Sequence, residues 1–565
     1  MDQIIECVPN FSEGNNPETI RQITEVIQSV DKVRLIDVDA GKATNRTVVT
    51  FVGPPAAVCE AAFLAVQKAA QLIDMRTHKG AHPRFGATDV LPLVPVKGIS
   101  MEETASLARQ LAQRIGEELH IPVYCYENAA FEEKRKNLAN CRSGEYEGLS
   151  QKLSQPEWKP DFGPALFNEK VAKSGATAVS ARNFLVAYNI NLNTTSTRWA
   201  NAIAFDIREK GRVKREGHPL TGKPLKDANG QPVFQPGLLK GVKGIGWYIE
   251  EYGIAQLSFN ITDINQTTIH QTFEAACQRA EVRGIRVTGS ELVGVVPLQA
   301  MLDAGRHFLH KQRRSAGVSD EELIKIAVKS LGLDELGPFD PEKKIIEYLI
   351  EDPVSNQLVN SSVRNFIENT ASESPAPGGG SASACMGAMG AALGVMVANL
   401  SAHKRGWDEQ WEIFAQWAEK GKAYQDQLLQ LVDEDANAFN AILSAFQLPK
   451  NTEHEKRHRQ DAIQNATRYA IEVPLKVMQL SYQSMEVMKV MADLGNPNSI
   501  SDVGVGAIAA RAAVMGAALN VRINANEFSD KNYIDSILNI VTEIITKTNQ
   551  LEEEILTIVY RQMQS

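Results

Sequence analysis

Two histidines, His78 and His82, open the stretch "HKGAHPRFGATDVLPLVPV" (78–96), although the whole chain of 565 residues contains only ten. A histidine that a rigid loop holds beside a carboxylate can carry protons near neutral pH. The spacing of four also resembles a zinc pair, but Gly80 and Pro83 break the helix that such a pair requires. We therefore expect proton transfer and no metal, with an ordinary basic surface loop as the alternative.

Candidate partners for His82 precede it in "LIDVDAGKATNRT" (35–47). Asp37 and Asp39 stand two apart on a predicted strand, so their side chains share one face of it. A glycine turn follows them. We expect these carboxylates to line one cleft with the histidine.

A second group of candidate residues lies in "SPAPGGGSASA" (374–384) and "LVDEDANAFNAIL" (431–443). The glycine turn lacks the GK[ST] ending of a phosphate loop, but it starts a predicted helix whose free N–H groups can hold a carboxylate or similar anion. Close backbone packing is the alternative. Asp433 and Asp435 point in different directions on a predicted helix, so we expect one in solvent and the other in a cleft.

The elements that position these residues follow two different patterns. Up to about residue 310, β-branched runs alternate with amphipathic stretches in the order β-α-β-β-α-β, and this order occurs twice. Beyond that point the periodicity is almost entirely helical. The sequence therefore predicts a multidomain chain: an α/β half of two split-βαβ-like subdomains with mainly antiparallel sheets, then an all-α helical bundle. The predicted boundaries are 1–180, 181–335, a linker at 336–358 and the bundle at 359–565.

Composition narrows the class of protein. The chain is 43% hydrophobic and 22% charged with a net charge of −9, which argues against a nucleic-acid partner. Its six cysteines are scattered without a CxxC pair, and its opening residues lack a signal-peptide pattern, so a cytoplasmic location is expected.

Two glycine-rich stretches have simple structural explanations. "SASACMGAMGAALGVMVANL" (381–400) has GxxxG spacing but weak hydropathy, so a tightly packed bundle helix is expected rather than a membrane span. "GVKGIG" (241–246) runs into a strand and not a helix, so it is no dinucleotide fingerprint. We expect Gly244 and Gly246 to mark an irregularity in that strand.

The first half resembles glutamate formimidoyltransferases over residues 1–335, through "VPNFSEG", "DVDAGKATNRTVVTFVG", "HKGAHPRFGATDVLPLVPV", "DFGPALF", "FLVAYNINLNT" and "VKGIGWYIEEYGIAQLSFNIT". That family transfers a formimino group from N-formimino-L-glutamate to N5 of tetrahydrofolate. The resemblance implies that His82 is catalytic, with Asp39 near it, and that Gly163, Pro164 and Gly175 contact folate. Two departures are Ala81, where relatives often carry glutamate, and a longer loop at 215–237.

The second half resembles the formimidoyltetrahydrofolate cyclodeaminases over about 360–530, through the glycine turn, "LVDEDANAF" and "GNPNSISDVGVGAIAARAAVMGAALNVRIN". That family joins N10 to the formimino carbon, releases ammonia and forms 5,10-methenyltetrahydrofolate, in pockets that form between helical subunits. The resemblance implies that Asp435 carries this activity. It also implies that the remaining matched positions complete a folate pocket: Gly378, Gly379, Asn496, Ser499 and Asp502.

Together the two resemblances imply a bifunctional cytoplasmic enzyme of histidine breakdown and one-carbon metabolism. Its substrates would be N-formimino-L-glutamate and tetrahydrofolate, and the chain would form a homo-oligomer built from dimers. Folates with oligoglutamate tails are polyanions, so basic runs such as "REKGRVKR" (208–215, including Arg208) are candidate tail sites, with a solvated helix face as the alternative. Two other interpretations stay open: a helical half that serves only for oligomerisation, and a folate-binding protein without catalysis.

Overall fold

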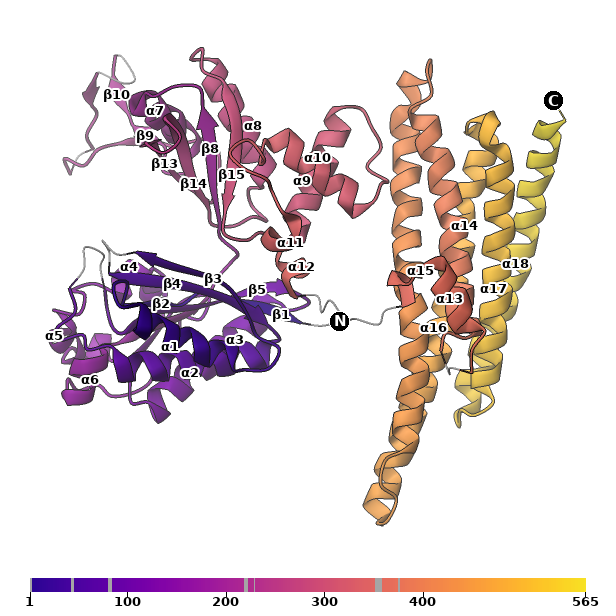
Figure 1. Ribbon diagram of the computed structural model, residues 1–565, viewed down its shortest axis with the longest axis horizontal. Coiled ribbons are helices and arrows are strands. Elements are labelled where there is room, and N and C mark those ends of the chain that lie inside the picture. Colours follow the sequence, from indigo (N-terminus) through magenta and orange to yellow (C-terminus); the bar gives the residue numbers. More distant parts are fainter. Residues whose placement is uncertain are drawn as a thin grey trace. The chain divides into compact units, whose positions relative to one another are not determined.

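The computed structural model describes residues 3–41, 45–79, 84–217, 222–227, 229–350, 358–373 and 376–564. By its internal contacts the chain forms two compact units, one of Met1–Ala304 with Ala327–Glu351 and the other of Gly305–Ile326 with Asp352–Ser565. Residues 305–326, which the sequence pattern places before the linker, thus pack with the helical half. Figure 1 shows the α/β character of the first unit and the long helices of the second.

The first unit begins with a mixed sheet in the strand order β1-β4-β2-β5-β7-β6, with β3 paired to β4. The β5–β7 and β6–β7 pairs are parallel and the others are antiparallel. The strands are β1 (Ile4–Cys7), β2 (Asn10–Phe11), β3 (Arg34–Gly41), β4 (Arg46–Gly53), β5 (Thr88–Lys97), β6 (Val123–Glu127) and β7 (Thr177–Ala181). The structure adds β7 to the predicted order, because "TAVSA" is buried at every position and shows no alternation.

Helices cover one face of this sheet: α1 (Pro17–Gln28), α2 (Pro55–Leu72) and α3 (Met101–Glu118). Side chains that alternate along the strands form the core beneath them, including Ile5, Phe51 and Leu91. Over β5–β7 the opposite face is covered by a short-helix segment with Phe85 and Tyr124 in its core. That segment contains η1 (Glu133–Arg135), α4 (Leu138–Cys141), α5 (Leu149–Leu153), η2 (Pro156–Trp158) and α6 (Glu169–Ser174).

The second sheet is antiparallel throughout, in the order β13-β14-β8-β15. Its strands are β8 (Val186–Leu192), β13 (Val242–Ile249), β14 (Ile254–Ile261) and β15 (Val287–Val293), and it packs with α7 (Thr197–Ile207) and α8 (Ile269–Glu281). Two small hairpin pairs lie in the glycine- and proline-rich excursion: β9 (Arg212–Val213) with β12 (Phe234–Gln235), and β10 (Arg215–Glu216) with β11 (Lys223–Pro224). The predicted α/β half with mainly antiparallel sheets is confirmed.

The irregularity predicted at Gly244 and Gly246 is wrong, because β13 pairs with β14 in an unbroken register from Val242 to Ile249. The glycines instead allow close packing. A Cβ on Gly246 would lie 2.3 Å from the backbone nitrogen of Asn201 in α7, and one on Gly244 would lie 2.3 Å from the Phe259 ring.

Short helices lead from the second sheet to the bundle: α9 (Leu298–Lys311), α10 (Asp320–Leu331), α11 (Pro341–Lys344), α12 (Ile346–Ile350), η3 (Leu358–Asn360) and α13 (Val363–Thr370). The bundle itself contains α14 (Gly379–Ala402), η4 (Asp408–Gln410), α15 (Trp411–Phe446), α16 (Glu453–Leu494), η5 (Pro497–Ser499), α17 (Ile500–Ala525) and α18 (Lys531–Met563). These helices lie side by side along their length (Figure 1). The predicted all-α second half is confirmed.

Small residues bring α14 and α17 into backbone contact, since a Cβ on Gly390 would lie 2.8 Å from the carbonyl oxygen of Gly506. Within the described residues, Gly379–Ala402 and Pro497–Ala525 have the length and hydropathy that a membrane span needs. In α14, 61% of that apolar window is buried inside the structure, as the predicted bundle helix requires.

Replacing Gly246 by Val should destabilise the first unit, because the added carbons must push α7 away from β13. Overpacking of this kind costs about 1–3 kcal/mol, which thermal or urea unfolding of the full chain would detect. Gly337→Ala is the matched control, since a Cβ there meets no atom within 4 Å. Equal stability of the two variants would contradict the packing argument.

Candidate functional site

His82 lies outside the described residues, which stop at Lys79 and resume at Arg84. The preceding residues are tied to the β3–β4 turn by Asn45. Its amide nitrogen donates to the Lys79 carbonyl at 2.8 Å, and its amide oxygen accepts from the Gly14 N–H at 2.9 Å. His78 Nε2 lies 2.9 Å from the Asn45 carbonyl oxygen, and burial lowers the pKa of His78. The contact with Asn45 therefore fixes the position of the His78 ring.

The other flank of this loop is fixed by Gly175, one of the predicted folate contacts. Gly175 has a φ of +67°, and a Cβ on it would lie 2.4 Å from the Cα of Gly86. The Ala176 N–H donates to the Phe85 carbonyl at 3.1 Å, and the Ala87 N–H donates to the Ser174 carbonyl at 2.7 Å. Only glycine fits this contact and backbone conformation, so the observed role of Gly175 is to hold the loop flank.

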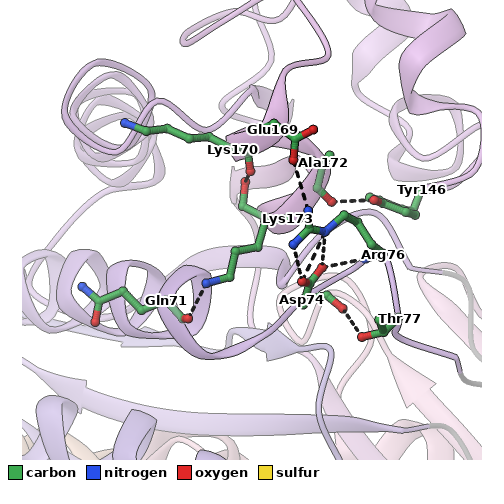
Figure 2. A network of polar contacts seen from close by, with 10 residues as sticks. Gln71, Asp74, Arg76, Thr77, Tyr146, Glu169, Lys170, Ala172 and Lys173 are labelled. Atoms are coloured by element: carbon green, nitrogen blue, oxygen red, sulfur yellow. Dashed lines mark hydrogen bonds and ion pairs between the residues drawn. The ribbon is translucent and has the colours of Figure 1, made fainter.

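Figure 2 shows how α6, which leads to Gly175, is anchored at the end of α2. Arg76 pairs with Asp74 at 2.6 Å and with Glu169 at 3.1 Å. Lys173 Nζ donates to the Gln71 carbonyl at 2.7 Å. These groups are largely solvent-exposed, so each contact stabilises the fold little, but together they set the position of α6.

Asp39 is exposed on β3 opposite Val48, and Asp37 is exposed opposite Thr50. Directly paired antiparallel residues point to the same side, so both carboxylates lie on the face away from the core residues Val49 and Phe51. The predicted shared face of the two aspartates is confirmed. Whether they line a cleft with His82 stays a prediction.

A charged cluster connects Asp39 to the strand that follows the histidine loop. Arg46 interacts electrostatically with Asp39 and with Asp89, and Asp89 pairs with Arg142 at 3.3 Å. The Phe85 N–H donates to Asp89 Oδ1 at 3.0 Å. Burial raises the pKa of Asp89 to about 6. Asp89, which sequence reasoning missed, is therefore a buried carboxyl beside the histidine loop, with a raised pKa.

Sequence reasoning also missed Glu6, which lies on the same face of the first sheet as Asp37 and Asp39. It pairs with Val52 and Val94 and is 4% exposed. Burial raises the pKa of Glu6 to about 7, while Arg182 acts to lower it. The strand alternation in "IIEC" was the available signal, because it turns Glu6 away from the apolar core.

The other predicted site residues of the first unit, Gly163, Pro164 and Arg208, lie apart from the flanks of the histidine loop. Gly163, with a φ of +84°, packs against Ile121 and Gly116 at the end of α3, and Pro164 follows it. Arg208 ends α7, donates from Nε to the Gly211 carbonyl at 3.0 Å, and stacks 3.8 Å from the centroid of the Phe205 ring. It lines a cavity of about 350 Å³ with three further arginines: Arg198, Arg212 and Arg215.

In the helical unit the structure brings the glycine turn and Asp435 together. The Ser381 N–H donates to Asp435 Oδ2 at 2.8 Å and the Ser381 hydroxyl lies 3.1 Å from the same oxygen. A Cβ on Gly380 would overlap the Asp435 carboxylate. Burial raises the pKa of Asp435, and the bonds from Ser381 act to lower it. The helix N-terminus that was predicted to hold an anion thus holds this side chain.

The surroundings of Asp435 are partly open. Among the described residues, a Cβ on Gly378 would meet no atom within 4 Å, and one on Gly379 would lie 3.4 Å from the amide nitrogen of Asn520. Asp433 points elsewhere and accepts from the Leu358 N–H at 2.6 Å. The prediction that the two aspartates diverge is confirmed, although the described contact binds Asp433 to backbone instead of leaving it to solvent.

The remaining predicted positions lie at the opposite end of α14. Ser401, near the end of that helix, accepts from the Asn496 N–H at 2.8 Å. Ser499 and Asp502 follow at the start of α17. Because α14 has 24 residues, this end is roughly 35 Å from the Asp435 end. Within one chain, the structure does not bring the two predicted groups together.

Comparison with known proteins gives matches over both units. Residues 4–182 match the formiminotransferase domain, N-terminal subdomain; residues 187–351 match the formiminotransferase domain; and residues 362–543 match formiminotransferase-cyclodeaminase. The chain is 44% identical over 531 residues to formimidoyltransferase-cyclodeaminase of Rattus norvegicus and 45% identical to that of Mus musculus, with 94% of each chain covered. It is 39% identical to glutamate formimidoyltransferase of Thermoplasma acidophilum over 54% of this chain and 92% of that one.

Replacing Glu6 by Gln should remove a pH dependence of stability. With a folded pKa near 7 against 4.5 unfolded, the folded state binds the Glu6 proton more tightly, so the free energy of unfolding falls as pH rises from about 4.5 to 7. We expect Glu6→Gln to stabilise the protein at pH 8, by at most about 3 kcal/mol, and to change little at pH 4.

Thermal unfolding at both pH values checks this, with the exposed Glu102→Gln as control. A melting temperature that fell at pH 8 in Glu6→Gln would show that the charged carboxylate is net stabilising beside Arg182.

Proposed function

The chain belongs to the formimidoyltransferase-cyclodeaminase family, and we infer from this that it catalyses two consecutive folate reactions. The first half transfers the formimino group from N-formimino-L-glutamate to N5 of tetrahydrofolate. The second half cyclises the product to 5,10-methenyltetrahydrofolate and releases ammonia. The observation that carries this inference is the set of three family matches, which follow one another along both halves of the chain. A relative with the same name as the family aligns over 94% of both chains.

In the transfer step, N5 loses a proton as it attacks the amidine carbon, and the departing glutamate nitrogen gains one. We propose that His82 carries both protons, which is typically worth about 10²–10⁴-fold in rate. The geometry around it supports the proposal, because Asn45 ties down one flank of its loop and Gly175 the other. Asp39 and Asp89 are proposed to tune the charge near this centre.

In the cyclisation step, N10 attacks the formimino carbon, loses its proton, and ammonia leaves after it is protonated. We propose that Asp435 accepts the first proton and returns one to the leaving nitrogen. Two features support this role: burial raises the pKa of Asp435, and Ser381 fixes one carboxylate oxygen. Neither proposed proton transfer calls for a metal, since imidazole and carboxylate groups carry them.

We propose that the folate substrate carries an oligoglutamate tail and that the arginine-lined cavity near Arg208 holds it. Guanidinium groups bind carboxylates through paired hydrogen bonds. Three of these arginines already have partners, because Arg212 pairs with Asp206, and Arg208 and Arg215 donate to backbone carbonyls. Arg198 at the same cavity is the proposed tail contact.

We further propose that the chain forms a homo-oligomer built from dimers, in the cytoplasm, and acts in histidine breakdown. Exposed apolar side chains on the neighbouring helices α14 and α17 support self-association; they are Met389, Met396, Leu400, Val505, Ile508, Leu519 and Ile523. A two-fold axis perpendicular to these helices would place the Asn496 end of one copy beside the Asp435 end of the other. The free cysteines agree with a reducing compartment.

Two substitutions should separate the activities. His82→Ala should lower formimino transfer by about 10²–10⁴-fold and leave cyclisation intact, while Asp435→Asn should do the reverse. Transfer is measured as glutamate released from N-formimino-L-glutamate in the presence of tetrahydrofolate, and cyclisation as ammonia release and methenyl-folate absorbance from supplied 5-formiminotetrahydrofolate. Asp433→Asn is the matched control for Asp435. If one substitution removed both activities, the sites would not be separate.

Co-expression of two inactive variants tests the composite cyclodeaminase site. If the Asp435 and Asp502 ends come from different copies, a mixed dimer of Asp435→Asn and Asp502→Asn chains keeps one intact site. Random pairing should then restore about a quarter of the cyclodeaminase activity. No recovery, with mixed dimers shown by native mass spectrometry, would contradict the arrangement.

A further inference from the structure

The histidine loop (residues 78–86) is held by its own ends and by the strand that follows it. The Arg84 guanidinium donates from Nη2 to the His78 carbonyl at 3.2 Å and so joins one end of the loop to the other. The next residue, Phe85, donates its N–H to Asp89 Oδ1 at 3.0 Å, and its ring is fully buried. The position of Asp89 therefore sets the point at which the loop enters β5.

Asp89 itself needs a partner, because it is a buried carboxylate. The residue is 1% exposed, and among the described residues no hydrogen bond reaches its second oxygen, Oδ2. The Arg142 guanidinium lies 3.3 Å from that oxygen and is the cation with the largest effect on it; Arg46 of β4 acts in the same sense and Glu145 in the opposite one. Without the Arg142 charge, Asp89 would take up a proton or turn away, and either change would weaken its hold on the Phe85 N–H.

Arg142 is in turn fixed by Lys152, a buried lysine of α5. Arg142 follows the last residue of α4, and the Lys152 ammonium donates to the carbonyls on either side of it, at 2.6 Å to Cys141 and at 3.3 Å to Ser143. It also donates to the Asn140 carbonyl at 3.0 Å. Carbonyls at the end of a helix have no partner within that helix. One ammonium group therefore sets the backbone from which the Arg142 side chain extends.

The same ammonium contacts the aromatic core of the short-helix segment, which includes Phe85. It lies 4.2 Å from the centroid of the Trp158 ring and 5.6 Å from that of Phe85, and the Phe85 and Tyr124 rings are 5.6 Å apart. Burial lowers the pKa of Lys152 to about 8, so near neutral pH most of it keeps its charge and its three donors. Lys152 thus connects the backbone of Arg142 to the residue at which the histidine loop ends.

We propose that Arg142 is a positioning residue of formimino transfer: Lys152 holds it in place, and it acts through Asp89 on the end of the histidine loop. This inference rests on the proposed role of His82 as the proton carrier of the first half. A proton carrier works only within hydrogen-bond reach of the reacting atoms, and a displacement of about 1 Å can lower a rate about 10²-fold. A residue that positions the carrier therefore affects the rate of the chemical step more than the binding of substrates.

Arg142→Ala in the full chain tests the proposal. We expect the transferase kcat, measured as glutamate released from N-formimino-L-glutamate, to fall by about 10-fold to 10²-fold, while KM for both substrates stays within about twofold. Guanidinium ion added at millimolar concentration should recover part of the lost rate, and so should Arg142→Lys, because each returns a cation beside Asp89.

Arg109→Ala is the matched control. Arg109 of α3 is also half-buried and donates to the Ala129 carbonyl at 3.0 Å, but among the described residues it has no contact with the histidine loop. This substitution should leave kcat unchanged. An equal loss in both variants, or a rise of KM in Arg142→Ala without a fall in kcat, would overturn the positioning role. The absence of any rescue in an Arg142→Ala chain that melts at the wild-type temperature would overturn it as well.

The route through Asp89 is tested by combining two substitutions. Asp89→Asn keeps an oxygen for the Phe85 N–H and removes the charge that Arg142 pairs with, so the double variant with Arg142→Ala contains no unpaired buried carboxylate. If Arg142 acts through Asp89, the double variant should be no slower than the slower single variant, because residues of one network do not contribute independently. Losses of rate that multiply would overturn the route. A wild-type chain without transferase activity would instead refute the proposed function itself.

Discussion

Both sheets of the first unit obey one physical constraint: consecutive side chains of a strand point to opposite faces, and helices bury one of those faces. In the first sheet this rule buries Ile5 and Phe51 beneath α1–α3 and directs Glu6 and Asp39 to the other side. In the second it turns Gly246 toward α7 and Trp247 away from it. The same alternation that builds each core therefore selects the residues that remain available for chemistry.

The helical unit obeys a different constraint. Its long helices bury one another along their length, so the candidate site residues lie beside the two ends of α14. Small residues let α14 and α17 approach so closely that Gly390 contacts the Gly506 backbone. Asp435 from α15 reaches the start of α14 through the space left by Gly380, and Ser381 binds it there. The Asn496 end of the bundle lies a full helix length away. If one site needs both ends, as we propose, a second copy of the chain must supply one of them.

Glycines at different positions in this chain have different structural roles. Gly175, whose contact with folate stays a prediction, carries a positive φ and packs against Gly86 beside the histidine loop. Gly246, predicted to mark an irregular strand, permits close helix packing. In each case the glycine in the sequence indicated that no side chain fits at that position. The residue that occupies the space is distant in the sequence, so only the fold shows which residue it is.

The sequence by itself determined the class of each half, because alternation and helical periodicity are local signals that survive without tertiary context. It also made Asp39 and Asp435 candidate site residues, through motifs that neighbouring residues define. Only the tertiary structure decided that Ser381 binds Asp435, that Glu6 and Asp89 are buried carboxyls with raised pKa values, and that Lys152 holds the backbone on either side of Arg142. Burial and hydrogen bonding depend on residues tens to hundreds of positions away, and no local pattern in the chain encodes those distances.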